Sequence, residues 1–302
     1  MKYLIKKAII LLAMRKRKRN YKFDEEDSVN FNNSYYFTAR SRNEESLFFR
    51  VGYRSNGEKE VWAVFVDKNG VEYVNKGQSA MATPSRFCYT GEDFEINGEF
   101  MSFTPEYEFT RDSDPIIFAN LLAKLKWKKG FDEGFKKLQQ THLEQIGRVT
   151  AEIRIDGITT DFLGYGFRDH SWGRRVWTDM DSHKWFIARF DDERYLCASY
   201  VNGLTAGYYI KMGRIYNVIN IKYENDNKTF TVTARKGKSL IEVVVQYTIK
   251  HSFPFDFQYK SYHIDECISE FVIDGVKGYG ITEFGENKDK LKDPNSIWRY
   301  MY

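Results

Sequence analysis

The strongest constraint on the fold is an alternation of apolar and polar residues with period two, which runs through most of the chain from Asn33 onward. Successive side chains of a strand point to opposite faces of a sheet, so this pattern predicts half-buried β-strands. The expected strands are short and lie about ten residues apart. They are Tyr35–Ala39, Leu47–Tyr53, Glu60–Val66, Phe94–Phe103, Val149–Ile155, Trp185–Phe190, Tyr195–Val201, Ala206–Lys211, Val218–Tyr223, Thr229–Ala234, Ile241–Lys250 and Ile268–Ile273.

Aromatic content supports the same fold class. Aromatic residues form 17% of the 302 residues, and they favour strands and bury large areas. Turn dipeptides at Asn69-Gly70, Asn97-Gly98 and Asn202-Gly203 separate the expected strands. The sequence therefore predicts an all-β, mainly antiparallel fold of the sandwich or barrel type.

One stretch departs from the alternation. Asp114 and Pro115 are typical of a helix N-cap followed by proline at the first helical position, and apolar residues then recur at helical spacing. This interruption predicts the domain organisation. We expect a tail over residues 1–22, a first β unit over 23–113, a helical connection over 114–146 and a second β unit over 147–302.

Two segments echo each other within the chain. Residues 155–169 read IDGITTDFLGYGFRD and residues 273–283 read IDGVKGYGITE. Asp169 and Glu283 fall three residues after the last glycine of each Gly-Tyr-Gly run. The echo is consistent with the same turn-and-strand unit in two duplicated barrels, since glycine permits close backbone approach at a bend.

The charge is unevenly distributed. Residues 1–22 hold nine Lys and Arg residues and no acid, which leaves 37 basic against 42 acidic residues in the body. A body of net charge about −5 is not a nucleic-acid binder. The tail has two interpretations: an amphipathic segment on an anionic membrane surface, or a solvated extension. Its apolar run is too short to span a bilayer.

The three cysteines are Cys88, Cys197 and Cys267, with no paired spacing. Reduced thiols and a cytoplasmic location, which includes the cytoplasmic face of a membrane, are expected. No phosphate-loop or dinucleotide motif is present, so no cofactor is predicted. Residue types alone leave metal binding at His142, His170 and His183 open, but no metal motif supports it.

The window of residues 168–185, RDHSWGRRVWTDMDSHKW, is the candidate site because it holds three of the six tryptophans and two of the five histidines. If Phe167–Trp172 is extended, Arg168, His170 and Trp172 share one face, and Asp169 lies on the other. Histidine and a carboxylate in an apolar pocket can exchange protons near neutral pH. A structural ion pair and a tryptophan core remain the alternative.

Two motifs of the chain resemble those of a known family. His142-Leu143-Glu144-Gln145 and the run GYGFRDHSWGRRVW over residues 164–177 are similar to the hallmark "HxEQ…GxGxRDHSWGxRxW" of a family of uncharacterised domains. That family resembles the carotenoid hydratase (hydroxyneurosporene synthase) superfamily. The resemblance spans about residues 24–285, and its DHSWG run is the specific part.

The resemblance implies two lipocalin-like barrels, an apolar ligand such as a lipid, an isoprenoid or a steroid, and, in some members, addition of water to a double bond. The residues matched by position are His142, Glu144, Arg168, Asp169, His170, Trp172 and Trp177.

Three functional hypotheses follow. The first is a module that binds an apolar small molecule, with Arg168, Trp172, Trp177, His142 and His183 as ligand contacts. The second is a hydratase or isomerase, with His170 or Asp169 donating a proton and Glu144 or Glu283 activating water. The third is a scaffold held at a membrane by the tail. Whether the protein is an enzyme, and its oligomeric state, stay open at this level.

Overall fold

The computed structural model describes residues 31–75, 79–116, 141–174, 180–201, 204–224, 228–257 and 261–291, with the single positions Leu4, Ala8 and Ala119. The chain divides into two compact units. The N-terminal unit comprises Asn20–Thr110 and Phe135–Arg175, and the C-terminal unit comprises Met1–Arg19, Arg111–Gly134 and Val176–Tyr302. Apart from those single positions, the predicted tail and most of the predicted helical connection lie outside the described residues.

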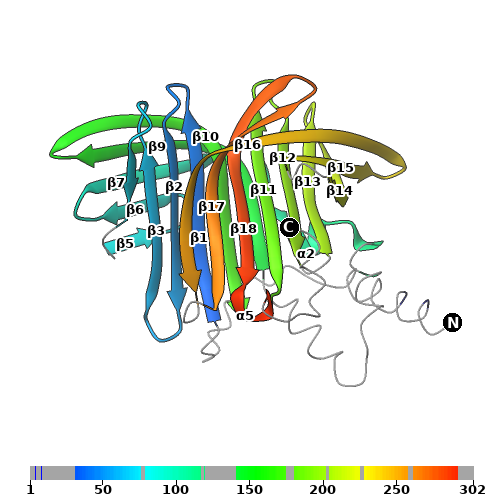
Figure 1. Cartoon of the computed structure of the whole chain (residues 1–302), viewed down its shortest axis with the longest axis horizontal. Coiled ribbons are helices and arrows are strands. Elements are labelled where there is room, and N and C mark those ends of the chain that lie inside the picture. Colours follow the sequence, from blue (N-terminus) through cyan, green and yellow to red (C-terminus); the bar gives the residue numbers. More distant parts are fainter. Residues whose placement is uncertain are drawn as a thin grey trace. The chain divides into compact units, whose positions relative to one another are not determined.

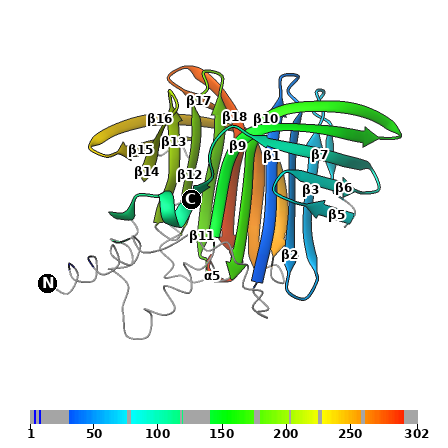
Figure 2. The ribbon, with the colours of Figure 1, turned by 180° about the vertical axis from the view of Figure 1, so that it is seen from behind.

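The N-terminal unit is a curled antiparallel sheet with the strand order β4-β3-β2-β1-β10-β9-β7-β6-β5, and β8 pairs with β9 (Figure 1). The two long strands β9 and β10 are paired along almost their whole length and bend strongly (Figure 2). The strands are β1 (Phe31–Ser41), β2 (Ser46–Arg54), β3 (Lys59–Val66), β4 (Glu72–Val74), β5 (Ser79–Ala82), β6 (Arg86–Thr90), β7 (Phe94–Ser102), β8 (Tyr107–Glu108), β9 (Thr141–Ile155) and β10 (Ile158–Arg174).

The C-terminal unit is a closed barrel of eight antiparallel strands, in which β11 pairs with both β12 and β18 (Figure 1). The strands are β11 (Ser182–Phe190), β12 (Tyr195–Val201), β13 (Leu204–Lys211), β14 (Arg214–Tyr223), β15 (Thr229–Lys236), β16 (Ser239–Phe257), β17 (Tyr262–Ile273) and β18 (Val276–Asn287). Two short helical turns are also described, α2 (Phe109–Asp112) and α5 (Lys288–Leu291). No helix in the described part of the chain is long and apolar enough to cross a bilayer.

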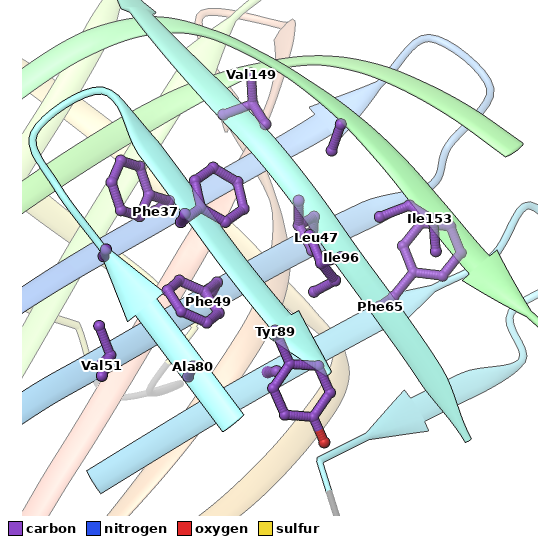
Figure 3. Close-up of a cluster of buried hydrophobic side chains, with 14 of the residues drawn as sticks. Phe37, Leu47, Phe49, Val51, Phe65, Ala80, Tyr89, Ile96, Val149 and Ile153 are labelled. Atoms are coloured by element: carbon purple, nitrogen blue, oxygen red, sulfur yellow. The ribbon is translucent and has the colours of Figure 1, made fainter. Parts of the chain in front are cut away.

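Each unit is built around aromatic side chains that alternate along the strands. In the N-terminal unit, Phe37 stacks on Phe87 at 4.5 Å between ring centroids, and Phe49 stacks on Phe87 at 5.2 Å. Figure 3 shows Phe37, Phe49 and Tyr89 among the labelled side chains of this core. Burial of such rings supplies the main driving force for curling the sheet.

The curled N-terminal sheet brings β5 back toward β2 and β3 without a strand ladder between them. The backbone N–H of Ala82 donates to the hydroxyl of Tyr53 at 2.9 Å, and Lys59 Nζ donates to the carbonyl of Ala80 at 3.1 Å. Side chains therefore satisfy backbone groups at a place where strand pairing stops.

The sequence echo corresponds to two matching hairpins. The turns at Asp156-Gly157 and Asp274-Gly275 both have positive φ at both positions, as a two-residue hairpin turn requires. Further along each second strand, a Cβ at Gly166 would lie 1.9 Å from the carbonyl oxygen of Thr38, and a Cβ at Gly280 would lie 1.8 Å from the carbonyl oxygen of Ile187. Glycine thus permits the tight contact of β10 with β1 and of β18 with β11.

The predicted all-β, antiparallel fold with two lipocalin-like barrels is confirmed, as one closed barrel and one half-barrel. The N-cap expected at Asp114 is also present, because its carboxylate accepts a hydrogen bond from the N–H of Ile116 at 2.9 Å. Strands β4, β5, β6 and β8 and the partners β10 and β18 were not among the expected strands. Their short length or frequent glycines obscure the alternation.

The domain boundaries differ from the expected ones at one place. Residues 147–174, expected in the second β unit, belong to the N-terminal sheet, where β10 pairs with β1 and β9 pairs with β7. Residues 141–146, expected within a helical connection, form the start of β9. Sequence-distant strand pairing closes the N-terminal unit, and this pairing leaves no trace in local periodicity.

Candidate functional site

The register of β9, β10 and β1 positions the predicted site residues of the N-terminal unit. Asp169 lies opposite Glu144 on β9, and Ser171 lies opposite His142. On the other side of β10, His170 lies opposite Tyr35 of β1, which belongs to the aromatic core. The expected alternation is confirmed: Arg168, His170 and Trp172 face the core, and Asp169 and Ser171 face the opposite side of the sheet.

On that opposite side, four side chains form a hydrogen-bonded chain. Ser171 Oγ donates to Asp169 Oδ1 at 2.9 Å and lies 2.7 Å from His142 Nδ1. His142 Nε2 lies 3.0 Å from Glu144 Oε1. Glu144 and Ser171 are fully buried, whereas the side chain of His142 is 24% exposed. His142 is therefore the member of this group, here called the outer cluster, that solvent reaches most.

The hydrogen-bond directions in the outer cluster assign one proton of His142. Since the hydroxyl of Ser171 donates to Asp169, the Nδ1 of His142 must carry the proton of its bond to Ser171. The remaining contact, between His142 Nε2 and Glu144 Oε1, then contains one proton. Such a pair can give or take a proton in general acid–base catalysis.

His170 has a different environment on the core side. Its ring stacks on Tyr35 at 4.1 Å and lies 4.5 Å from the ring of Trp172, and its Nε2 is 2.9 Å from Asn33 Oδ1. Burial, together with the positive charge of Arg168 and the nearby His142, lowers the pKa of His170 to about 3. His170 is therefore neutral near pH 7 and donates its Nε2 proton to Asn33.

Arg168 connects three segments on the core side. Its guanidinium donates to the side chain of Gln145, to the carbonyl of Pro84 at 3.1 Å and to Glu106 at 3.4 Å. Burial lowers the pKa of Arg168 although Glu106 and Asp169 favour the charged form. These contacts connect β10 to β9 and to the segments that contain Pro84 and Glu106. Arg168 forms an ion pair with Glu106.

The C-terminal unit holds two further predicted site residues, His183 and Glu283. His183 Nε2 bonds to Glu283, and His183 Nδ1 lies 2.6 Å from the hydroxyl of Tyr262. One ring nitrogen of His183 thus contacts a carboxylate and the other a phenol. The structure thus divides the predicted site residues between the two units.

The two units share one further feature. Asp169 faces Glu144 across β10 and β9, and Glu283 faces Glu266 across β18 and β17. In each pair one carboxylate bonds to a histidine, Glu144 to His142 and Glu283 to His183. Asp169 and Glu283 each lie three residues after a glycine of the sequence echo.

Trp177, predicted as a ligand contact, lies outside the described residues. Trp172 is buried beside His170 on the core side. In the described part of the chain, no group of three His, Cys, Asp or Glu side chains is placed to hold a metal ion.

The family model described as "Domain of unknown function (DUF7064)" matches residues 19–288, which is most of the chain. The chain belongs to the DUF7064 family. The comparison with curated proteins finds no match for this DUF7064 chain.

Solved structures show the same fold at low sequence identity. An AttH-type protein of Nitrosomonas europaea is 12% identical and has a TM-score of 0.53, with 89% of this chain and 97% of that chain covered. CghA determined with Sch210972 is 10% identical and has a TM-score of 0.58, with 87% and 90% covered. A second structure of CghA has a TM-score of 0.57 with this chain. At this identity the likeness of the DUF7064 chain to these proteins concerns the fold alone.

Sequence reasoning missed several residues of the clusters in this DUF7064 chain: Ser171, Asn33, Tyr35, Tyr262 and Glu266. Ser171 could have been predicted from the sequence, because strand alternation already places it on the same face as Asp169. The others come from neighbouring strands, and only the strand register brings them to the site.

Proposed function

We propose that the protein binds an apolar small molecule inside a lipocalin-like barrel. The observation that carries this proposal is the aromatic interior of the closed C-terminal barrel. Phe186 lies within 6.2 Å of the rings of Tyr223, Phe230, Tyr247 and Phe284, measured between centroids. A barrel of eight strands encloses enough space for side chains or one small ligand.

The two ends of this barrel interior differ. At one end, Arg194 donates to Asp274 at 2.8 Å and to the carbonyl of Ile273 at 3.0 Å, and it lies over the ring of Phe190. Burial opposes the charge of Arg194, but hydrogen bonds to Asp192, Tyr209 and Asp274 outweigh it and raise its pKa. This network closes the end where β11 finishes.

Toward the other end, interior side chains keep contact with solvent. Tyr223, Tyr247 and Phe284 are half-buried, whereas Phe186 and Phe230 deeper in the barrel are fully buried. Rings that face inward and yet remain accessible support entry of an apolar ligand from this end. The fold shared with CghA, which has been determined with Sch210972, supports the same proposal.

A fluorescent apolar probe, N-phenyl-1-naphthylamine, tests this function by titration. We expect saturable binding to the full chain, weakened about tenfold or more by Tyr247→Glu, because a carboxylate in an apolar wall costs at least 1.4 kcal/mol of binding energy. Val244→Glu is the matched control, since Val244 lies on the same strand and is 53% exposed. Absence of saturable binding, or equal weakening by both variants, would contradict the proposal.

The outer cluster supports a second function, acid–base catalysis on an alkene. His142 would donate a proton to one alkene carbon, the oxygen of water would bond to the other, and Glu144 or Asp169 would accept the proton that water releases. The specific support is the exposed edge of His142 within a chain that contains two carboxylates. Proton donation by His170, the role expected first, fits poorly with a side chain that is neutral near pH 7.

Deuterium incorporation from D2O into squalene, measured by mass spectrometry, tests the second function. We expect incorporation with the wild-type protein and its loss in His142→Gln. Incorporation that survives His142→Gln and disappears in His170→Gln would assign the proton to His170 instead. A wild-type protein that incorporates no deuterium would remove squalene hydration and isomerisation from consideration.

A further inference from the structure

Lys184 is a nucleophilic side chain that points into the C-terminal barrel. It lies two residues before Phe186 on β11, and Phe186, Ala188 and Phe190 all belong to the barrel core. Alternation along the strand places Lys184 on the same inward face. Lysine is rarely placed toward a protein interior, so its presence there calls for a chemical reason.

Aromatic side chains lie beside the amine. Lys184 Nζ lies 4.3 Å from the ring centroid of Tyr223 and 5.9 Å from that of Phe284. Within the sheet, Lys184 faces Tyr200 on β12 and Phe284 on β18. We call Lys184, Tyr200, Tyr223 and Phe284 the amine cage. The rings form an apolar wall beside the amine.

Two properties of the amine cage favour reaction with a carbonyl group. Burial lowers the pKa of Lys184, which raises the share of neutral, nucleophilic amine at a given pH. Burial raises the pKa of Tyr200, so its phenol stays protonated and can donate a hydrogen bond to a carbonyl oxygen. Both groups belong to neighbouring strands and face the same interior.

The position of the cage fits a ligand that enters from one end. Lys184 and Phe190 are six residues apart on β11, which corresponds to about 20 Å along an extended strand. The Arg194 network lies beyond Phe190, so the cage is near the opposite end. Its four members are half-buried, and solvent reaches them.

We infer that the amine of Lys184 forms an imine with the carbonyl carbon of an apolar aldehyde or ketone bound in the C-terminal barrel. This inference rests on the proposed function and specifies its ligand class. The nitrogen lone pair attacks the carbonyl carbon to give a carbinolamine, and one N–H proton of the amine passes to the carbonyl oxygen; the second N–H proton later leaves with this oxygen as water. Loss of water then forms the C=N bond, and no oxidant or reductant is consumed.

Decanal with sodium cyanoborohydride tests the inference on the full chain, because reduction converts an imine to a stable secondary amine. We expect intact mass spectrometry to show one reduced decanal adduct and peptide mapping to place it at Lys184. The adduct is lost in Lys184→Arg, which keeps the positive charge in the cage. Lys222→Arg is the matched control, since Lys222 lies on β14 with a side chain that is 72% exposed, and it retains the adduct.

Calorimetric titration with 1-decanol, which cannot form an imine, separates the two proposals. Binding of decanol without trapping of decanal at Lys184 overturns the imine and leaves the proposed function standing. Failure of both decanol and decanal to bind overturns the proposed function. Labelling spread evenly over exposed lysines such as Lys222, with Lys184 no more modified than the others, also overturns the imine.

Discussion

His170 lies between two aromatic rings, and its burial makes protein stability depend on pH. In the unfolded chain the imidazole takes up a proton below about pH 6.5, whereas in the folded chain it does so only near pH 3. Between these values the unfolded state binds more protons. Stability is therefore complete above pH 6.5 and falls as the pH is lowered toward 3, by at most about 1.4 kcal/mol per pH unit from this residue.

Urea denaturation at pH 7 and at pH 5 measures this effect. We expect the wild-type protein to lose more stability between the two pH values than His170→Phe, which has no imidazole to protonate. Equal losses in both proteins would show that His170 is not held neutral by the fold.

Single residues also show how far the sequence predicts a site. Alternation correctly assigned Arg168 and His170 to one face and Asp169 to the other, because a strand leaves no other choice. It did not reveal that Asn33 and Tyr35 would flank His170, since these contacts depend on which strand lies next to β10.

At the scale of elements, the second strands of the matching β9–β10 and β17–β18 hairpins lie in close contact with β1 and β11. Gly166→Ala places a methyl group against the backbone oxygen of Thr38, so β10 and β1 must move apart. We expect a loss of about 3 kcal/mol in unfolding free energy. Gly213→Ala is the control, because its Cβ meets no atom within 4 Å and costs only about 1–2 kcal/mol from its positive φ.

Chemical denaturation of both glycine variants checks this prediction. Equal destabilisation by Gly166→Ala and Gly213→Ala would mean that the close contact of β10 with β1 relaxes without cost. The sequence alone pointed to these hairpins through the Ile-Asp-Gly and Gly-Tyr-Gly runs, because turn chemistry is local. It could not assign the pairing partners β1 and β11, which are distant in sequence.

At the scale of the whole molecule, the chain forms two β units, and periodicity and aromatic content predicted this class correctly. The place of the division was harder to predict. Residues 147–174 continue the sheet begun by residues 31–102, because β9 and β10 complete it between β7 and β1. A helical interruption in the sequence therefore does not mark the end of a sheet when later strands return to it.

The central proposal is that an apolar molecule occupies a barrel of this protein, and the aromatic interior of the C-terminal barrel supports it. Native mass spectrometry of the full chain, purified from several expression hosts without detergent, tests this claim most directly. We expect a species that carries the added mass of one apolar molecule, which organic extraction removes. Protein that is free of any added mass from every host would contradict it.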